Sequence, residues 1–165
     1  MEAEINCRLN GRAVRQAIDT RLLLVEFIRD VLSLKGTRVG CLTGDCGACT
    51  VDIDGSVTKS CMVLALSAED REVTTIEGRT DIAHIQEAFV ELNGFQCGFC
   101  TTGMVLTAAE LLRDNPNPTE AEIRKAISGN LCRCTGYDAI VRSISSVARR
   151  VEDVRVLETG SKPMS

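Results

Sequence analysis

The spacing of the cysteines constrains this chain more than any other feature of its sequence. The chain has nine cysteines in 165 residues, and eight of them fall into two groups of four. The first group follows the spacing C-x4-C-x2-C-x11-C and consists of Cys41, Cys46, Cys49 and Cys61. The second group follows C-x2-C-x31-C-x-C and consists of Cys97, Cys100, Cys132 and Cys134. Cys7 lies outside both groups, and its alternation with apolar residues predicts a small buried side chain.

The cysteines indicate metal or redox chemistry rather than disulfide bonds. Their number is odd, and the first residues, MEAEINCRLN, contain neither an apolar signal segment nor a twin arginine. We therefore expect a cytoplasmic protein, in which clustered cysteines more often bind metal. No apolar run reaches the roughly 18 residues of a membrane span. The formal net charge is −4 and the basic residues are scattered, which argues against a nucleic-acid partner.

The first group has the spacing of a plant-type [2Fe-2S] site. Its loop, GTRVGCLTGDCGACT, also contains four glycines, which are Gly36, Gly40, Gly44 and Gly47. Glycine permits positive φ and lets backbone N–H groups approach the sulfurs, where they stabilise an anionic cluster. A zinc site demands less of the backbone, so the loop favours a [2Fe-2S] cluster. The second group, CxxC followed by CxC, is compatible on this evidence with an iron–sulfur cluster or with structural zinc.

The N-terminal part has the pattern of a small α+β unit. Alternation predicts a strand around Ile5–Leu9, a turn at Asn10 and Gly11, and a return strand over 12–18. Helical spacing predicts a helix over 21–33 with Thr20 as its cap.

Beyond the first cysteine loop the pattern returns to strands. A hairpin that turns at Asp54 and Gly55 is expected to deliver Cys61, and a further strand is expected over 72–76. The first domain is thus predicted to span residues 1–78, with a hinge over 78–81.

The second domain, residues 79–157, is predicted to contain four helices. The apolar stripes and a capping box from Thr119 to Glu122 place these helices at 82–92, 103–113, from 119 onward, and 137–151. The cysteines of the second group lie in the loops between the first and second and between the third and fourth helices. Antiparallel packing would bring both loops to one end of the bundle. Residues 158–165 are expected to form a flexible tail.

Four segments carry a family resemblance. GCLTGDCGACTV, KSCMVLA, QCGFCTTGM and GNLCRCTGY, in this order, resemble the small iron–sulfur subunit of the molybdenum hydroxylases, a family that includes xanthine dehydrogenase, carbon monoxide dehydrogenase and aldehyde oxidoreductases. The resemblance covers about residues 3–152. It implies a plant-ferredoxin-like β-grasp domain that carries a [2Fe-2S] cluster on the first group. It also implies a four-helix domain that carries a second [2Fe-2S] cluster on the second group.

The resemblance further implies partners and a role in electron transfer. Electrons would pass from molybdopterin in a large subunit to the helical-domain cluster, then to the ferredoxin-like cluster, and then to FAD in a medium subunit. The complex would be a dimer of heterotrimers, and this chain would contain no catalytic residue. Gln96 matches the family glutamine that contacts the pterin. Thr102 stands where the family usually has proline, and its hydroxyl is expected to cap the helix instead.

Two other functions compete with this one. The chain could be a free-standing ferredoxin-like electron carrier, although such a carrier needs neither the helical half nor Gln96. It could also be a structural zinc protein.

Three further residues could have a role near the clusters. His84 is expected to be structural or exposed, because eight cysteines already satisfy two clusters. Arg133 either offsets cluster charge or reaches the pterin phosphate, or else it is a solvated surface residue. Asp45 would lower a cluster potential only if it lay close to the cluster.

Overall fold

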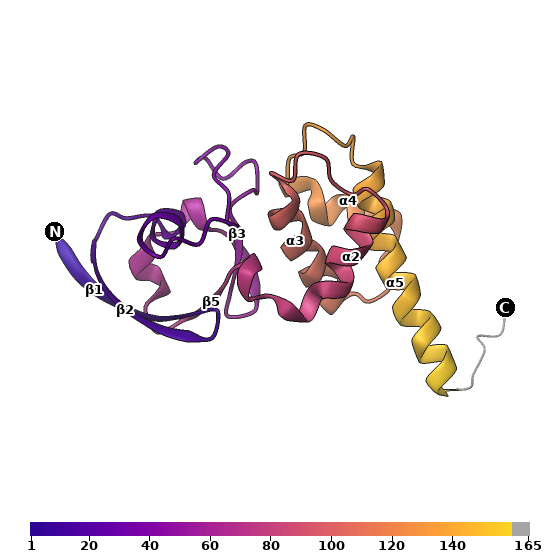
Figure 1. The fold of residues 1–165 in the computed structure, drawn as a ribbon, viewed down its shortest axis with the longest axis horizontal. Coiled ribbons are helices and arrows are strands. Elements are labelled where there is room, and N and C mark those ends of the chain that lie inside the picture. Colours follow the sequence, from indigo (N-terminus) through magenta and orange to yellow (C-terminus); the bar gives the residue numbers. More distant parts are fainter. Residues whose placement is uncertain (160–165) are drawn as a thin grey trace.

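A five-stranded mixed sheet forms the N-terminal half of the molecule and a group of helices forms the C-terminal half (Figure 1). The structure is a computed structural model that describes the backbone of residues 1–159 and the side chains of residues 1–148. From residue 160 onward, the predicted tail lies outside the described residues. The strands are β1 (Glu2–Leu9), β2 (Arg12–Asp19), β3 (Thr50–Ile53), β4 (Ser56–Lys59) and β5 (Glu72–Thr74). Their order is β2-β1-β5-β3-β4, with β1 and β5 parallel and the other pairs antiparallel.

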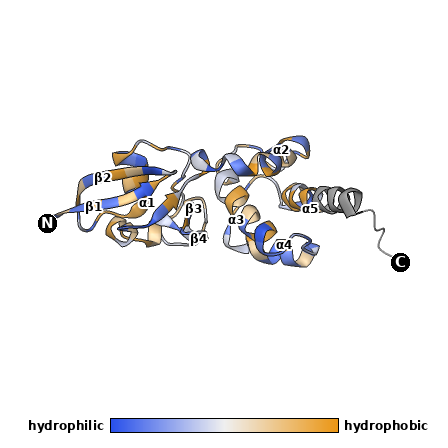
Figure 2. Cartoon of the chain, turned by 90° about the horizontal axis from the view of Figure 1, so that it is seen from below, coloured by the Kyte–Doolittle hydropathy of each residue, from blue (hydrophilic) through white to orange (hydrophobic). Residues whose placement is uncertain are grey.

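The first hairpin follows the sequence pattern. Ile5, Cys7 and Leu9 are buried on one face of β1, and hydrophilic and hydrophobic residues alternate along the strand (Figure 2). Asn10 and Gly11 both have positive φ, as a two-residue hairpin turn requires. The prediction for Cys7 is confirmed, since its side chain packs in the apolar core of the sheet.

The helix predicted over 21–33 is shorter and starts later than expected. Helix α1 spans only Leu24–Glu26 and continues as a π-helix over Phe27–Val31. The preceding backbone pairs with a distant segment instead: Leu24 N–H donates to Val63 O, and Ala65 N–H donates to Leu22 O. Thr20 therefore does not cap the helix, and this prediction is wrong.

The four predicted helices of the second half are confirmed. They are α2 (Ala83–Glu91), α3 (Thr101–Asp114), α4 (Glu120–Ala126) and α5 (Asp138–Thr159). The capping box is present, because Thr119 Oγ1 accepts the Glu122 N–H while the Glu122 carboxylate accepts the Thr119 N–H. Helix α5 extends beyond the predicted end at Val151. Short 3-10 helices span Ser60–Met62, Ala65–Ala68, Ile76–Gly78, Thr80–Ile82 and Ile127–Gly129.

Each half has its own apolar core, and α3 connects them. Val57 and Ile76 from the N-terminal half pack against the helical core. Glu110 of α3 accepts the Val57 N–H at 2.8 Å, and Arg113 donates to Gly55 O at 2.6 Å. The hairpin of β3 and β4 is thereby attached to α3. In the described part of the chain, no helix is both long enough and apolar enough to cross a membrane.

Candidate metal centres

The first cysteine group comes together between the π-helix and the hairpin of β3 and β4. A loop without regular structure delivers Cys41, Cys46 and Cys49, and the 3-10 helix after β4 delivers Cys61. Cys46 is a near neighbour of Cys41, and Cys61 has Cys49 as its nearest thiol while also lying within electrostatic range of Cys41. Cys49 and Cys61 are buried and pack against Val25 of α1.

The two pairs have different electrostatic surroundings. The backbone N–H groups of Thr43 and Cys46 each donate to Cys41 Sγ at 3.4 Å. The Thr43 hydroxyl and these N–H groups lower the pKa of Cys41 to about 6. Burial and the neighbouring Cys49 instead raise the pKa of Cys61 to about 11. A metal binds the thiolate form of cysteine. The N–H groups around Cys41 favour that form and so support metal binding directly. The buried Cys49 and Cys61 instead need the positive charge of the metal to balance the negative charge of their thiolates.

Glycine is required in this loop for steric as well as conformational reasons. Gly47 has φ +69°, and a Cβ there would lie 2.5 Å from Gly129 O. Gly40 leaves room for the Cys46 side chain, because a Cβ on Gly40 would lie 2.8 Å from Cys46 Sγ. A side chain at either position would therefore displace a cysteine or the backbone that faces it.

The second cysteine group lies where two interhelical loops meet. The loop between α2 and α3 contributes Cys97 and Cys100, and the loop between α4 and α5 contributes Cys132 and Cys134. Cys97 Sγ and Cys134 Sγ are 3.6 Å apart, and Cys100 is the neighbour of Cys132. Burial raises the pKa of Cys100 to about 12, whereas the Phe99 N–H lowers the pKa of Cys97. The predicted meeting of the two loops at one end of the helices is confirmed.

Both groups are all-thiol donor sets arranged as two pairs. A [2Fe-2S] cluster is held by four cysteines shared between two irons, so paired thiols fit it. A zinc site needs all four ligands around one ion. The residues present thus fit two-iron clusters, which supply one-electron redox chemistry when bound.

The two loops that carry the cysteines touch each other directly. Leu131 N–H donates to Cys46 O at 2.9 Å, and Asn130 Nδ2 donates to Gly47 O at 3.2 Å. Asn130 was not among the residues predicted from the sequence. The only available signal was its place beside the CxC motif, because the contact joins residues 83 positions apart.

Gln96 lies at the second group. Its Nε2 donates to Cys134 O at 3.0 Å, and its side chain is exposed. Arg133 is also exposed. Asp45 is exposed and accepts a hydrogen bond from the Thr43 hydroxyl at 2.5 Å.

The capping role expected of Thr102 is wrong. Helix α3 begins at Thr101 with Cys100 as its N-cap, so Thr102 lies inside the first turn. Its buried hydroxyl has no hydrogen-bond partner within the described residues.

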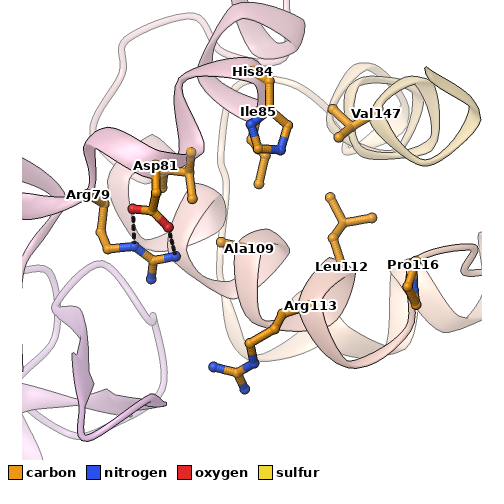
Figure 3. A pocket seen from close by; sticks show the side chains of 10 residues that line it. Arg79, Asp81, His84, Ile85, Ala109, Leu112, Arg113, Pro116 and Val147 are labelled. Carbon is orange, nitrogen blue, oxygen red and sulfur yellow. Dashed lines mark hydrogen bonds and ion pairs between the residues drawn. The ribbon is translucent and has the colours of Figure 1, made fainter. Parts of the chain in front are cut away.

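His84 lies away from the cysteines of both groups. It is exposed on α2 and lines a cavity of about 340 Å³ (Figure 3), in whose lining no cysteine takes part. Arg79 lies on the same cavity and forms two hydrogen bonds with Asp81. The position of His84 agrees with the expectation that it is exposed.

Comparison with known proteins identifies the two halves. Residues 7–79 match the family described as 2Fe-2S iron-sulfur cluster binding domain, and residues 75–145 match the family described as [2Fe-2S] binding domain. The nicotine 6-hydroxylase small subunit of Paenarthrobacter nicotinovorans is 44% identical over 143 residues, which cover 86% of this chain and 87% of that subunit. The caffeine dehydrogenase subunit gamma of Pseudomonas sp. (strain CBB1) is 44% identical over 154 residues, which cover 90% and 92% of the two chains.

Solved structures agree with these relatives. Quinoline 2-oxidoreductase from Pseudomonas putida 86 has a chain with a TM-score of 0.84 and 39% identity, covering 90% of this chain and 97% of that chain. The aldehyde oxidoreductase from Desulfovibrio desulfuricans ATCC 27774 has a TM-score of 0.86 and 35% identity, and the match covers 100% of this chain but 19% of the other. The expected ferredoxin-like and helical architecture is confirmed. This chain belongs to the family of small iron–sulfur subunits of the molybdenum hydroxylases, and it is an electron-transfer component with two consecutive [2Fe-2S]-binding domains.

Proposed function

We propose that this chain carries electrons from a molybdopterin centre in a large partner subunit to FAD in a medium partner subunit. The observation that carries the proposal is the presence of two all-thiol sites, each built as two pairs, whose loops are joined by hydrogen bonds. Oxidation of one substrate molecule releases two electrons, and each cluster accepts and passes on one electron at a time. No bond forms or breaks in this chain, because the cofactors supply the chemistry and the protein positions them.

The proposed ligands are the eight clustered cysteines. One cluster is held by Cys41, Cys46, Cys49 and Cys61. The other is held by Cys97, Cys100, Cys132 and Cys134. The arrangement of the thiols supports both sets, because in each group every thiol has at least one other thiol of the same group as a neighbour.

The proposed direction of transfer runs from the helical half to the sheet half. Cys97 and Cys134 are exposed, and the exposed Gln96 side chain is fixed beside them by its bond to Cys134 O. These residues suit contact with a pterin on the large subunit, where Gln96 would bind the cofactor. At the first site, the exposed side chains of Leu42 and Met62 offer apolar surface to the FAD-binding subunit.

The partner composition that we propose is one large and one medium subunit, assembled as a dimer of heterotrimers. Two relatives are themselves named as a small subunit and a subunit gamma, which supports separate partner chains. We place the domain boundary between residues 78 and 79, since the fully buried residues of the two apolar cores lie on either side of it. We also propose a cytoplasmic location, where reduced thiols are available for cluster assembly.

The proposal is tested on protein isolated from its native host. The preparation should be red-brown, contain four irons per chain as expected for two [2Fe-2S] clusters, and give two distinct electron paramagnetic resonance signals on reduction. Cys132→Ser should remove one signal and leave the other. A single signal, or zinc in place of iron, would contradict the two-cluster function.

A second measurement separates a complex from a free carrier. The chain should co-purify with larger subunits that bring molybdenum and flavin. A chain that isolates alone even at low salt would instead support a free-standing ferredoxin-like carrier.

A further inference from the structure

One buried side-chain amide connects the loop of the first cysteine group to the loop before α5. Asn130 is 4% exposed, and its Nδ2 donates to Gly47 O at 3.2 Å. The next residue, Leu131, donates its backbone N–H to Cys46 O at 2.9 Å. Two consecutive carbonyls of one loop are therefore bound by two consecutive residues of the other.

Helix α3 fixes the orientation of this amide. The Thr107 hydroxyl, which is also buried, donates to Asn130 Oδ1 at 3.1 Å. With Oδ1 occupied in this way, the amide must present its Nδ2 hydrogens to Gly47 O. A buried polar group left without a partner costs free energy, so both hydrogen bonds favour one arrangement of the three segments.

Around Gly47, helix α3 and the loop before α5 lie so close that there is no room for an added side chain. A Cβ on Gly103 of α3 would lie 2.2 Å from Gly47 O, and a Cβ on Gly47 would lie 2.5 Å from Gly129 O. Gly103 and Gly47 thus allow α3 and the two cysteine loops to lie this close together. The hydrogen bonds of Asn130 and Leu131 keep them there.

We propose that Asn130 is a positioning residue for electron transfer between the two clusters. It keeps Cys46, in the first ligand set, against Leu131, which directly precedes Cys132 in the second set. This inference rests on the proposed function. In the transfer step one electron leaves one cluster, which is oxidised, and enters the other, which is reduced. Asn130 touches neither cluster; it sets the separation across which the electron moves, and the transfer rate falls steeply as that separation grows.

Asn130→Leu tests this role in the cluster-loaded protein. Leucine keeps the branched shape and volume of the side chain but removes the donor and the acceptor. In the fully reduced protein, both resonance signals should remain while the spin–spin splitting between them weakens. Hydrogen exchange at the Leu131 amide should become about fivefold faster, as expected when one hydrogen bond is lost.

A control and two supporting variants separate positioning from general stability. Ile85→Val truncates a buried residue of the helical core on α2, and it should leave the splitting and the Leu131 exchange rate unchanged. Gly103→Ala should also weaken the splitting, because its methyl group would push α3 away from Gly47 O. Thr107→Val, which frees the amide without removing it, should give a smaller change in the same direction. If the Asn130→Leu protein fails to bind its clusters, Thr107→Val provides the test of the positioning role.

The outcomes distinguish this inference from the function on which it rests. A wild-type protein without two [2Fe-2S] signals would overturn the proposed function. Two signals without splitting in the wild type would overturn the proximity of the clusters. Two signals whose splitting and Leu131 exchange are unchanged in Asn130→Leu or Thr107→Val would overturn the role of Asn130 alone.

Discussion

The Tyr137 hydroxyl accepts a hydrogen bond from the backbone N–H of Cys132 at 2.9 Å. Tyr137 is the last residue before α5, and its own N–H donates to the Thr135 hydroxyl, which lies 3.1 Å from Cys132 Sγ. Two hydroxyl groups thus shape the loop that delivers Cys132 and Cys134. The chain's own side chains hold this loop in place. The loop therefore loses less conformational freedom when a metal binds.

Tyr137→Phe should disturb the second site alone. The substitution leaves the Cys132 N–H without its acceptor and should lower the free energy of unfolding by about 1 kcal/mol. The resonance signal of the helical-domain cluster should shift or broaden, because hydrogen bonding near the ligands changes. The other signal should be unchanged. Denaturant unfolding and electron paramagnetic resonance measure the two effects, and an equal change in both signals would contradict the assignment.

Gly47→Ala and Gly11→Ala form a matched pair. Both glycines have positive φ, +69° and +77°, so each alanine carries a similar backbone cost of about 1–2 kcal/mol. At Gly11 a Cβ meets nothing within 4 Å, whereas at Gly47 it collides with Gly129 O. Gly11→Ala should therefore keep both clusters, while Gly47→Ala should lose the ferredoxin-like cluster. Iron content and the two resonance signals measure cluster binding in both variants. Full iron content in Gly47→Ala would show that the loop can rearrange to accommodate the added methyl group.

Local patterns predicted much of this molecule, and contacts between distant segments account for the rest. Asn10 with Gly11 predicted the first hairpin, and the Thr119 capping box predicted the start of α4, because each depends on neighbouring residues. The helix over 21–33 was predicted too long, since its first turn depends on pairing with residues 63–65.

At the sites, cysteine spacing together with the predicted antiparallel packing of the helices predicted which cysteines come together. It did not predict Asn130 or Tyr137, whose roles depend on the exact approach of two loops. A buried asparagine and an exposed one look alike in a sequence. Only the fold shows that this one bridges Gly47 and Thr107.

Arg79→Ala should weaken the connection between the two halves. The Arg79 guanidinium lies 3.5 Å from the Asp52 carboxylate, and their side chains are 18% and 11% exposed. Removing the arginine takes the ion-pair partner from a largely buried carboxylate, which keeps only its hydrogen bond from the Gly55 N–H at 2.6 Å. We expect a loss of about 1–2 kcal/mol, below the roughly 3–5 kcal/mol of a fully buried pair.

Asp81→Asn provides the comparison for Arg79→Ala. Its carboxylate also pairs with Arg79, but its side chain is 63% exposed, so this substitution should change the free energy of unfolding by about 0.5 kcal/mol or less. Thermal unfolding measures both variants. An Asp81→Asn effect as large as that of Arg79→Ala would show that the contact with Asp52 contributes little.

Cys7→Ala and Cys49→Ala test which buried thiols are ligands. The two side chains are 6% and 2% exposed, so the same substitution removes a similar amount of buried sulfur. Cys7 packs in the core of the sheet, whereas Cys49 lies beside Cys61 and Val25. Cys7→Ala should lower the free energy of unfolding by about 1 kcal/mol and leave both resonance signals intact. Cys49→Ala should abolish the signal of the ferredoxin-like cluster and release its iron, while the signal of the helical-domain cluster persists. Retention of both signals in Cys49→Ala would remove this cysteine from the ligand set, and loss of a signal in Cys7→Ala would show that packing in the sheet core controls cluster assembly.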